Sequence, residues 1–247
     1  MEIRAIKTEI FHESEDLLQF IFKYIKKIPE SSVLVVTSKI LALSEGRTAS
    51  YKSEKEKVEL IKKESQMAIK TSIAWLTIKD GIVMANSGID ESNSEGKLIL
   101  SPQNSFASAE ILRKSIMKKF NLKKFGVLIV DSGLLPLRAG AVGVALGYAG
   151  FEGVRSYVGK KDLFGRVLKM SKTNVADALA TSAVLLMGEG KEAQPLALIT
   201  HAPVIFINKK VNRKELIMDR KKDLYAPLFG RALKDVVRHD FAKSHEK

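Results

Sequence analysis

Residues 126–131 read GVLIVD, and this stretch decides the fold class because four consecutive apolar side chains lead directly into an acid. A short run of mostly β-branched apolar residues is typical of a strand that is buried on both faces. Residues 33–37, VLVVT, have the same character. The sequence therefore predicts two strands that lie inside the protein rather than at its surface.

Around these two runs, helix and strand patterns follow one another without a regular strand–helix–strand rhythm. Helices are predicted from Ser14 to about Pro29, from Ser53 to about Lys70, from Ser105 to about Phe120 and from Asn174 to Met187. Further strands are predicted at residues 2–10, 82–86, 97–100, 142–150, 195–200 and 204–207. The run at 142–150 is rich in glycine, so it is equally compatible with closely packed backbone. This mixture predicts an α+β or mixed α/β architecture.

Two helix starts carry capping signals. Asn174 is followed three residues later by Asp177, and Ser53 is followed three residues later by Glu56. An oxygen-bearing side chain at the N-cap accepts a hydrogen bond from a free amide of the first turn, and a Glu three residues on completes a capping box. Gly188 follows the last of these helices and is expected to end it.

The length of the chain allows one large domain or two small ones. It has 247 residues, of which 45% are hydrophobic, which is enough for a substantial core. No linker is evident, and residues 1–247 are interpreted as a single unit. The glycine-rich block at 133–153 is the place where a boundary between two lobes is expected.

Composition excludes several classes of protein. The chain has no cysteine, which excludes disulfides and thiol chemistry. Its N-terminus alternates polar and apolar residues and lacks the apolar core of a signal peptide. The longest nearly uncharged stretch, Ala139–Phe151, is too short to cross a bilayer. A cytoplasmic protein without a membrane span is expected.

The formal net charge is +13, and it has three possible origins. A basic face can bind nucleic acid, a positive field can attract small anions such as nucleotides and glutamate, or the lysines can simply be solvated. Arg113–Lys124 holds six basic residues and no acid, and the tail after Asn208 is also basic. Neither stretch carries interleaved aromatic residues for base stacking. Small anions are therefore favoured over nucleic acid.

Several familiar site motifs are absent from the sequence. It contains neither the GxxxxGK[ST] phosphate loop nor GxGxxG at the start of a helix. Its histidines lack metal-ligand spacing; they are His12, His201, His239 and His245. Any nucleotide chemistry must therefore use a different kind of site.

Two acids are the best candidates for metal ligands. Asp90 follows an apolar strand and a glycine turn in GIVMANSGID, and Asp131 ends the strand GVLIVD. Carboxylates are ligands that Mg²⁺ and Mn²⁺ prefer, with phosphates and water completing the shell. Ser132 adds a hydroxyl beside Asp131. For either Asp alone, a local turn contact explains the residue equally well; two such sites in one chain favour metal binding.

The remaining polar candidates each have an ordinary alternative. Arg138, in the rigid segment PLRAG, suits carboxylate or phosphate binding, or a surface salt bridge. Asn93 fits a ligand contact, but a simple turn explains it better. Ser38 and Lys39 follow a buried strand, where hydroxyl and ammonium groups fit phosphate or an ordinary helix start. The segment MGEGKE allows close backbone approach to a ligand, or a helix cap and loop; it contains Met187, Gly188, Glu189 and Gly190.

A set of segments occurs in a specific order between about residues 33 and 200. They read VTSKIL, SEGR, SGIDESN, VDS, PLRAGAVGVALGYAGF, KDLFGR, NVADALA and LLMGEG. Each segment by itself is weak evidence for a family. The ordered set is specific, and it resembles the γ-glutamyl ligase family typified by the coenzyme F-420:L-glutamate ligases. The resemblance implies a two-lobed α+β fold, a homodimer, and an enzyme that adds L-glutamate to a carboxylate of a small acceptor.

The resemblance also implies a co-substrate, a metal and their ligands. The nucleotide is GTP or ATP, and the metal ion is Mg²⁺ or Mn²⁺. Metal contacts are implied for Asp90, Asp131, Ser132 and Glu189. Nucleotide contacts are implied for Ser38, Lys39, Asn93 and the loop at 187–194 with Met187, Gly188 and Gly190, and the N-terminal segment Thr8–Phe11 contributes. Asp90, Asp131 and Arg138 are expected to be catalytic.

Three departures from the family pattern bear on the acceptor. The usual Asp-Thr is Asp131-Ser132 here, Gly-Arg-Pro-Trp-Arg is replaced by Leu-Leu-Pro-Leu-Arg at 134–138, and a Lys expected before SEGR is Leu43. The PLR variant, together with KDLFGR at 161–166 and DLYAPLFGR at 223–231, looks more like a branch associated with folate metabolism. The acceptor is thus a folate-type or a deazaflavin, F-420-type molecule. The competing hypothesis is a non-catalytic basic module that binds nucleic acid or an anionic cofactor.

Overall fold

A computed structural model describes residues 1–219 and 221–227. The chain forms two compact units. The first unit comprises Met1–Gly46 and Pro102–Leu216, and the second comprises Arg47–Ser101 and the described residues among 217–227. The glycine-rich block at 133–153 lies within the first unit. The interpretation of residues 1–247 as one ligase-like unit stays a prediction.

A five-stranded sheet forms the centre of the first unit. Its strands are β1 (Glu2–Ile6), β12 (Leu196–Thr200), β2 (Ser32–Thr37), β8 (Phe125–Leu134) and β9 (Ala141–Ala149), in that spatial order. The two apolar runs that decide the fold class are neighbours: β2 and β8 pair in parallel, and every other pair in the sheet is antiparallel. Val33–Val36 and Val127–Val130 are fully buried, which confirms the two predicted strands.

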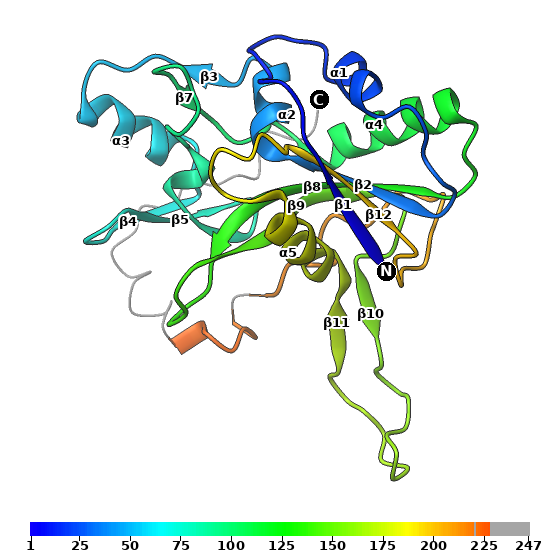
Figure 1. The fold of residues 1–247 in the computed structure, drawn as a ribbon. Helices are drawn as coiled ribbons and strands as arrows, with labels where there is room; N and C mark the ends of the chain where they lie inside the picture. Colours follow the sequence, from blue (N-terminus) through cyan, green and yellow to red (C-terminus); the bar gives the residue numbers. More distant parts are fainter. Residues whose placement is uncertain (220, 228–247) are drawn as a thin grey trace. The chain divides into compact units, whose positions relative to one another are not determined.

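Helices cover both faces of this sheet, as Figure 1 shows. The helices α1 (Leu17–Tyr24), α2 (Ser38–Ser44) and α4 (Ser105–Phe120) pack on one face, and α5 (Val175–Met187) packs on the other. Because successive strand residues point to opposite faces, Leu34 joins the first core and Val35 joins the second. The predicted α+β fold is confirmed.

The glycines of β9 let helices approach its backbone. A Cβ atom on Gly143 would lie 2.3 Å from the Ala180 carbonyl oxygen of α5, and one on Gly147 would lie 2.5 Å from the carbonyl carbon of Ser105 in α4. Real Cβ atoms do not come this close to backbone. Both interpretations of residues 142–150 therefore hold, because the segment is a strand and is closely packed.

A two-stranded arm projects from the first unit (Figure 1). It pairs β10 (Val154–Ser156) with β11 (Lys172–Asn174), and β11 leads directly into α5. The intervening segment exposes Leu163 and Phe164 almost completely, at 98% and 96%.

Residues 47–101 of the second unit form small antiparallel sheets and one α-helix. Their elements are β3 (Thr48–Ala49), α3 (Glu54–Lys63), β4 (Met67–Lys70), β5 (Trp75–Lys79), β6 (Ile82–Ala85), the 3₁₀ turn η1 (Asn86–Gly88) and β7 (Leu98–Ile99). Strands β4, β5 and β6 form one sheet, and β3 pairs with β7. The core is small, with Ile61, Ile89, Leu98 and Leu100 buried at its centre.

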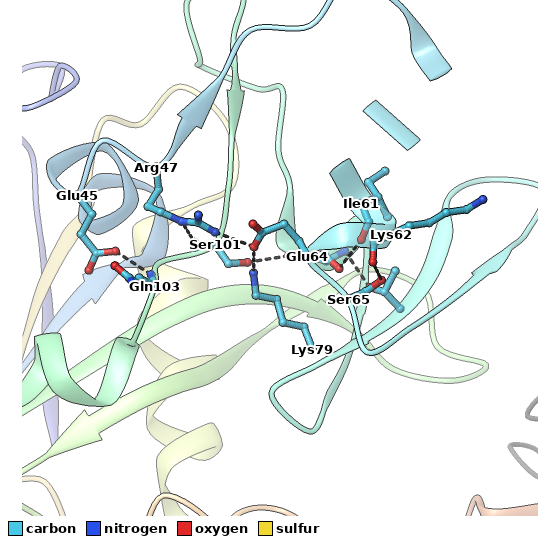
Figure 2. A network of polar contacts seen from close by, with 11 residues as sticks. Glu45, Arg47, Ile61, Lys62, Glu64, Ser65, Lys79, Ser101 and Gln103 are labelled. Carbon is cyan, nitrogen blue, oxygen red and sulfur yellow. Dashed lines mark hydrogen bonds and ion pairs between the residues drawn. The ribbon is translucent and has the colours of Figure 1, made fainter. Parts of the chain in front are cut away.

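A polar cluster stabilises the second unit (Figure 2). The carboxylate of Glu64 accepts hydrogen bonds from Lys79 at 2.6 Å and Arg47 at 2.7 Å. The Nε of Arg47 also donates to the carbonyl of Ser101 at 3.1 Å. These contacts join the two ends of the segment 47–101 to the end of α3 and to β5.

Several predicted boundaries are wrong. The helix after Ser53 ends at Lys63 rather than near Lys70, because residues 67–70 form β4 and pair with β5. Likewise α1 ends at Tyr24 and β1 at Ile6, both earlier than predicted. Residues 204–207 form no strand, since Phe206 makes only an isolated bridge to Phe151. After α1 the apolar pattern continues because Ile25 and Ile28 of the following loop are buried in the core.

The predicted caps are largely confirmed. The side chain of Asn174 accepts from the Asp177 amide at 3.0 Å, and that of Ser53 accepts from the Glu56 amide at 3.3 Å. The cap of α4 is Asn104 rather than Ser105. Similarly, Asp16 caps α1 in place of Ser14. The caps are side chains that reach back to a first-turn amide, and one-residue errors follow from having two such residues in succession or close by.

Among the helices of residues 1–219 and 221–227, none combines the length and apolarity needed to cross a bilayer. The C-terminal part of the basic tail, including His239 and His245, lies outside the described residues.

Candidate active site

A hydrogen-bonded cluster joins β8 to the loop after α5. The hydroxyl of Ser132 donates to the Glu189 carboxylate, with distances of 2.6 Å to Oε1 and 2.8 Å to Oε2. The backbone amide of Ser132 donates to Oδ1 of Asp131 at 2.8 Å. Ser132 and Glu189, both singled out from the sequence, therefore meet in the first unit, and Asp131 precedes Ser132 in the strand.

The position of Asp131 in its strand differs from the prediction. The buried apolar run ends at Val130, as expected, but β8 continues to Leu134 because its outer half pairs with β9 as a hairpin. Asp131 therefore lies within the strand and opposite Val144. The strand register shifts between Ile129 and Val130. Such bulges occur next to active sites, where they redirect side chains.

The loop that follows α5 carries Glu189 and places it next to β8. The hydroxyl of Thr181 donates to the Gly143 carbonyl at 2.8 Å, and Asp177 accepts from the Ala145 amide at 2.8 Å. These two bonds fasten α5 to β9, the neighbour of β8. Gly188 ends α5 with a φ of 82°, a conformation that favours glycine. The chain then turns and places Glu189 beside Ser132.

The loop after Gly188 is ordered by its own contacts. The amide of Gly190 donates to Oε2 of Glu192 at 2.8 Å. A Cβ on Gly188 would lie 2.5 Å from the Glu192 side chain. Sequence reasoning missed Glu192 as an ordering residue, although it stands in the segment MGEGKE. The signal in the sequence is an acid two residues after a loop glycine, because such a side chain can accept a hydrogen bond from the glycine amide.

Two further predicted segments meet this loop within the first unit. The amide of Thr8 donates to the Ala193 carbonyl at 2.8 Å, and the amide of Thr37 donates to the Pro195 carbonyl at 3.0 Å. Ser38, which is buried, and Lys39 follow Thr37 in the first turn of α2. The N-terminal segment, the start of α2 and the loop at 187–195 therefore converge, as expected of parts of one site.

Arg138 lies outside the paired residues of β8 and β9, whereas Asp131 and Ser132 lie within them. It occupies an exposed turn, where its amide donates to the Leu135 carbonyl at 3.3 Å. The turn lies beyond the last pair of the hairpin, Leu134–Ala141. No described contact joins Arg138 to Ser132 or Glu189, so its catalytic role stays a prediction.

Asp90 and Asn93 belong to the second unit. The Asp90 carboxylate accepts from the Ser92 amide at 2.7 Å and from the Ser92 hydroxyl at 2.9 Å. This is the local turn contact that the sequence leaves open as the alternative. Asn93 is exposed and has a φ of 52°, which suits an Asn in a turn. The meeting of Asp90 with Asp131 stays a prediction.

Glu91, next to Asp90, is held by two partners. It accepts from the Tyr51 hydroxyl at 2.8 Å and pairs with the Lys57 ammonium at 2.8 Å. The hydrogen bond from Lys57 and then that from Tyr51 lower the pKa of the Glu91 carboxyl. These contacts fix the turn that carries Asp90 against α3.

The cluster of the first unit suits a hard divalent cation that is only partly held by protein. Asp131 and Glu189 supply carboxylates and Ser132 supplies a hydroxyl, all of them oxygen donors. Across the described part of the chain, no group of three or more His, Asp or Glu side chains is gathered for a metal ion. Mg²⁺ is commonly bound by one or two carboxylates, with phosphates and waters filling the other positions. The donor set therefore fits a metal–nucleotide complex better than a fully protein-enclosed ion.

Comparison with known proteins covers most of the chain. The family model for F420-0:gamma-glutamyl ligase matches residues 5–201. The coenzyme F420:L-glutamate ligase of Methanococcus maripaludis (strain DSM 14266) is 37% identical over 217 residues, which cover 86% of each chain. That of Methanocaldococcus jannaschii is 34% identical over 245 residues, 91% of this chain and 96% of the relative.

A third relative, the coenzyme F420:L-glutamate ligase of Archaeoglobus fulgidus, is 34% identical over 209 residues, 77% of this chain and 83% of its own length. The matched range 5–201 contains the whole cluster of Asp131, Ser132 and Glu189 and the segments that converge on it. The fold, the order of the segments and the similarity over this range agree: the chain belongs to the F420-0:gamma-glutamyl ligase family.

Proposed function

We propose that this protein is a nucleotide- and metal-dependent ligase that joins the amine of L-glutamate to a carboxylate of a small acceptor. The observation that carries the proposal is the contact between Ser132 and Glu189, beside Asp131. It places two carboxylates and a hydroxyl in the unit where the segments at Thr8, Thr37 and 187–195 converge. Membership of the ligase family supports the same reaction class.

The reaction needs activation because a carboxylate is a poor electrophile. The acceptor carboxylate attacks the γ-phosphorus of GTP or ATP, which forms an acyl phosphate and releases the nucleoside diphosphate. The amine of glutamate then attacks the acyl carbon, forms the amide and expels inorganic phosphate with loss of a proton. Such steps depend on positioning and charge neutralisation more than on covalent help from protein.

Each candidate residue has a role in this scheme. Asp131, Ser132 and Glu189 would hold Mg²⁺ or Mn²⁺, and Asp90 is a further candidate metal ligand; when bound, the ion neutralises phosphate charge. Ser38, Lys39 and Asn93 would bind the nucleotide, and the loop with Met187, Gly188 and Gly190 would approach it through backbone. Arg138 would steady a substrate carboxylate or phosphate by paired hydrogen bonds.

The preferred acceptor in this proposal is a deazaflavin of the coenzyme F420 type. The support comes from the relatives, which are coenzyme F420:L-glutamate ligases. A folate-type acceptor is the second candidate. It is favoured by the segment Leu134–Arg138, whose sequence departs from the pattern of the F-420 ligases.

Mass spectrometry tests the reaction and the acceptor together. The protein is incubated with GTP or ATP, Mn²⁺ or Mg²⁺, L-glutamate, and either a deazaflavin precursor or a folate. A glutamyl mass increment on one acceptor, with release of phosphate, is expected. The alternative, a non-catalytic module for nucleic acid or an anionic cofactor, requires no increment and a steep fall of oligonucleotide binding with salt.

We also propose that the protein is a homodimer. The support is the arm of the first unit, whose Leu163 and Phe164 are almost fully exposed. Contiguous exposed apolar groups of this kind are usually covered by a partner. Light scattering should give twice the chain mass, and L163S with F164S should give the monomer mass.

A further inference from the structure

A cavity of about 410 Å³ lies in the first unit, among residues that the proposed reaction does not use. It is formed by one side of α4, the end of β9 and the segment 208–213. Its volume falls within the range of pockets that hold small molecules. The residues of the ligase cluster, Asp131, Ser132 and Glu189, do not line it.

The walls of the cavity are aromatic and aliphatic. Phe106 is the partly exposed aromatic ring of the wall, and the fully buried ring of Tyr148 supports it at 5.2 Å between centroids. Ile111 and Val211 complete the apolar surface. Tyr148 is held in place because its hydroxyl is hydrogen-bonded to the Glu215 carboxylate, which also accepts from the Gly153 amide at 2.9 Å. This surface is suited to a flat apolar ring.

The polar lining is mainly cationic. Lys114, Lys210 and Arg213 line the cavity, and Glu110 is the acid among its lining residues. The Glu110 carboxylate lies 3.5 Å from the Lys114 ammonium and 3.8 Å from Arg113. Within the described part of the chain, Lys210 and Arg213 make no ion pair. The cavity therefore presents two uncompensated cations beside an apolar wall.

The segment that carries these two cations is anchored on a buried arginine. Arg113 of α4 is 4% exposed and donates from Nη2 to Oδ1 of Asn208 at 2.7 Å. The same nitrogen donates to the Ile207 carbonyl at 3.3 Å, and Nε donates to the Phe125 carbonyl at 2.8 Å. These charge-assisted hydrogen bonds hold Ile207 and Asn208, the start of the segment, against α4. The cavity is thus a built feature and not the gap beneath a loose loop.

We propose that this cavity binds a small molecule made of a flat apolar ring with an acidic group. The ring packs on Phe106, Ile111 and Val211, and the acidic group meets Lys210 and Arg213. The inference does not rest on the proposed ligase reaction. Its ligand has two possible sources, the ring portion of the acceptor or a separate metabolite, and both share this chemistry.

Binding of two matched probes tests the proposal. The first is 1-naphthoate, and the second is the neutral 1-naphthalenemethanol, which has the same ring without the charge. Isothermal titration calorimetry with the full chain is expected to show tighter binding of the acid. K210A combined with R213A should weaken naphthoate binding about tenfold, since each exposed charge pair contributes up to about 1 kcal/mol. The affinity for the alcohol should not change.

Matched variants distinguish binding in the cavity from binding elsewhere on the surface. K55A combined with K63A removes two surface charges that do not line the cavity, and this variant should bind naphthoate as the wild type does. A107W fills the cavity and should abolish binding of both probes, while circular dichroism and thermal melting confirm folding. The proposal is overturned if K210A/R213A leaves naphthoate affinity unchanged, or if a folded A107W still binds. It is also overturned if L163S/F164S removes the binding, which would place the probes on the arm.

Competition distinguishes the two sources. In the ligase assay, saturating naphthoate raises the KM for the acceptor if the cavity holds the acceptor ring. An unchanged KM assigns the cavity to a separate metabolite. If no ligase activity is found with any acceptor, the binding experiment still decides whether the cavity is a site.

Discussion

Ser132 and Glu189 are joined by a hydroxyl that donates to both carboxylate oxygens, at 2.6 and 2.8 Å, although 57 positions separate the two residues in the chain. A hydrogen bond to a charged group is about twice as strong as one between neutral groups. The contact therefore fixes the loop after α5 relative to β8. It also means that the serine hydroxyl and the glutamate carboxylate can offer oxygens to the same ligand.

Replacement of Ser132 tests whether this hydroxyl acts in the site. S132T keeps the hydroxyl and restores the residue usual in the family, so kcat/KM should remain within about threefold of the wild type, or about 0.65 kcal/mol. S132A removes the hydroxyl and should raise the metal concentration needed for half-maximal activity. Titration of ligase activity with Mn²⁺ measures both. Equal behaviour of the two variants would exclude a role for the hydroxyl.

Asp131→Asn should reduce kcat by about 10²–10³-fold, which is the usual effect of removing one preorganised electrostatic contact. The amide keeps the shape of the side chain and can still accept a hydrogen bond from the Ser132 amide, so the fold should survive. Asp80→Asn is the matched control. Asp80 lies in a turn with a φ of 51°, which Asn adopts readily, and this variant should be fully active.

Asp90→Asn decides between a metal ligand and a turn residue. If Asp90 is a metal ligand, Asp90→Asn should weaken Mn²⁺ binding in the presence of nucleotide. If Asp90 only accepts from Ser92, Mn²⁺ affinity stays at the wild-type level and thermal stability alone falls. Calorimetric titration with Mn²⁺ distinguishes these outcomes.

The parts of the fold that could be predicted from sequence are those that local chemistry determines. The apolar runs at 33–37 and 126–131 could be predicted as strands because short, mostly β-branched apolar runs are typical of strands buried on both faces. The Asn174 cap is equally local. By contrast, β4 could not be predicted. Residues 67–70 form a strand because they pair with β5 across a turn, and the charged sequence of the preceding helix does not indicate where that helix ends. Strand pairing of this kind depends on the partner as much as on the segment.

The same division applies to the candidate site. Asp131, Ser132 and Glu189 are candidates from sequence because each is polar in a Gly-rich or apolar context, and because their segments follow a family order. That Ser132 contacts Glu189 depends on how α5 packs against β9 at Gly143, which no local pattern specifies. The contact of Thr8 with Ala193 uses only backbone atoms, so the identity of neither residue predicts it.

Gly143→Ala should destabilise the first unit by about 1–3 kcal/mol, as overpacking of a core does. The added Cβ would lie 2.3 Å from the Ala180 carbonyl oxygen, and α5 must shift to accept it. Because α5 carries Glu189, the shift should also lower ligase activity in the fraction that remains folded. Urea unfolding and kcat of the folded enzyme measure the two effects. Wild-type values of both would show that α5 does not depend on this close approach.

Glu64→Gln should remove a pH-dependent part of the stability of the second unit. Burial of Glu64 raises the pKa of its carboxyl, but Lys79 and Arg47 lower that pKa by more, so it lies below its ordinary value in the folded protein. A group with a lowered folded pKa stabilises the protein above its unfolded pKa, about 4.3 for Glu. The stabilisation is lost as the pH falls through the folded value. At pH 7 the variant should therefore be less stable by about 2 kcal/mol, since it also leaves two half-buried cations without a carboxylate.

Urea unfolding between pH 3 and pH 7 measures this difference for the wild type and Glu64→Gln. The two stabilities should converge as the pH falls below about 4, because protonated Glu64 and glutamine are then both neutral. Glu59→Gln, an exposed change on α3, is the control and should follow the wild-type curve at every pH. A constant difference between wild type and Glu64→Gln across the range would mean that the contact with Lys79 and Arg47 stabilises the unit through packing. In that case the carboxylate charge would contribute nothing to the stability of the second unit.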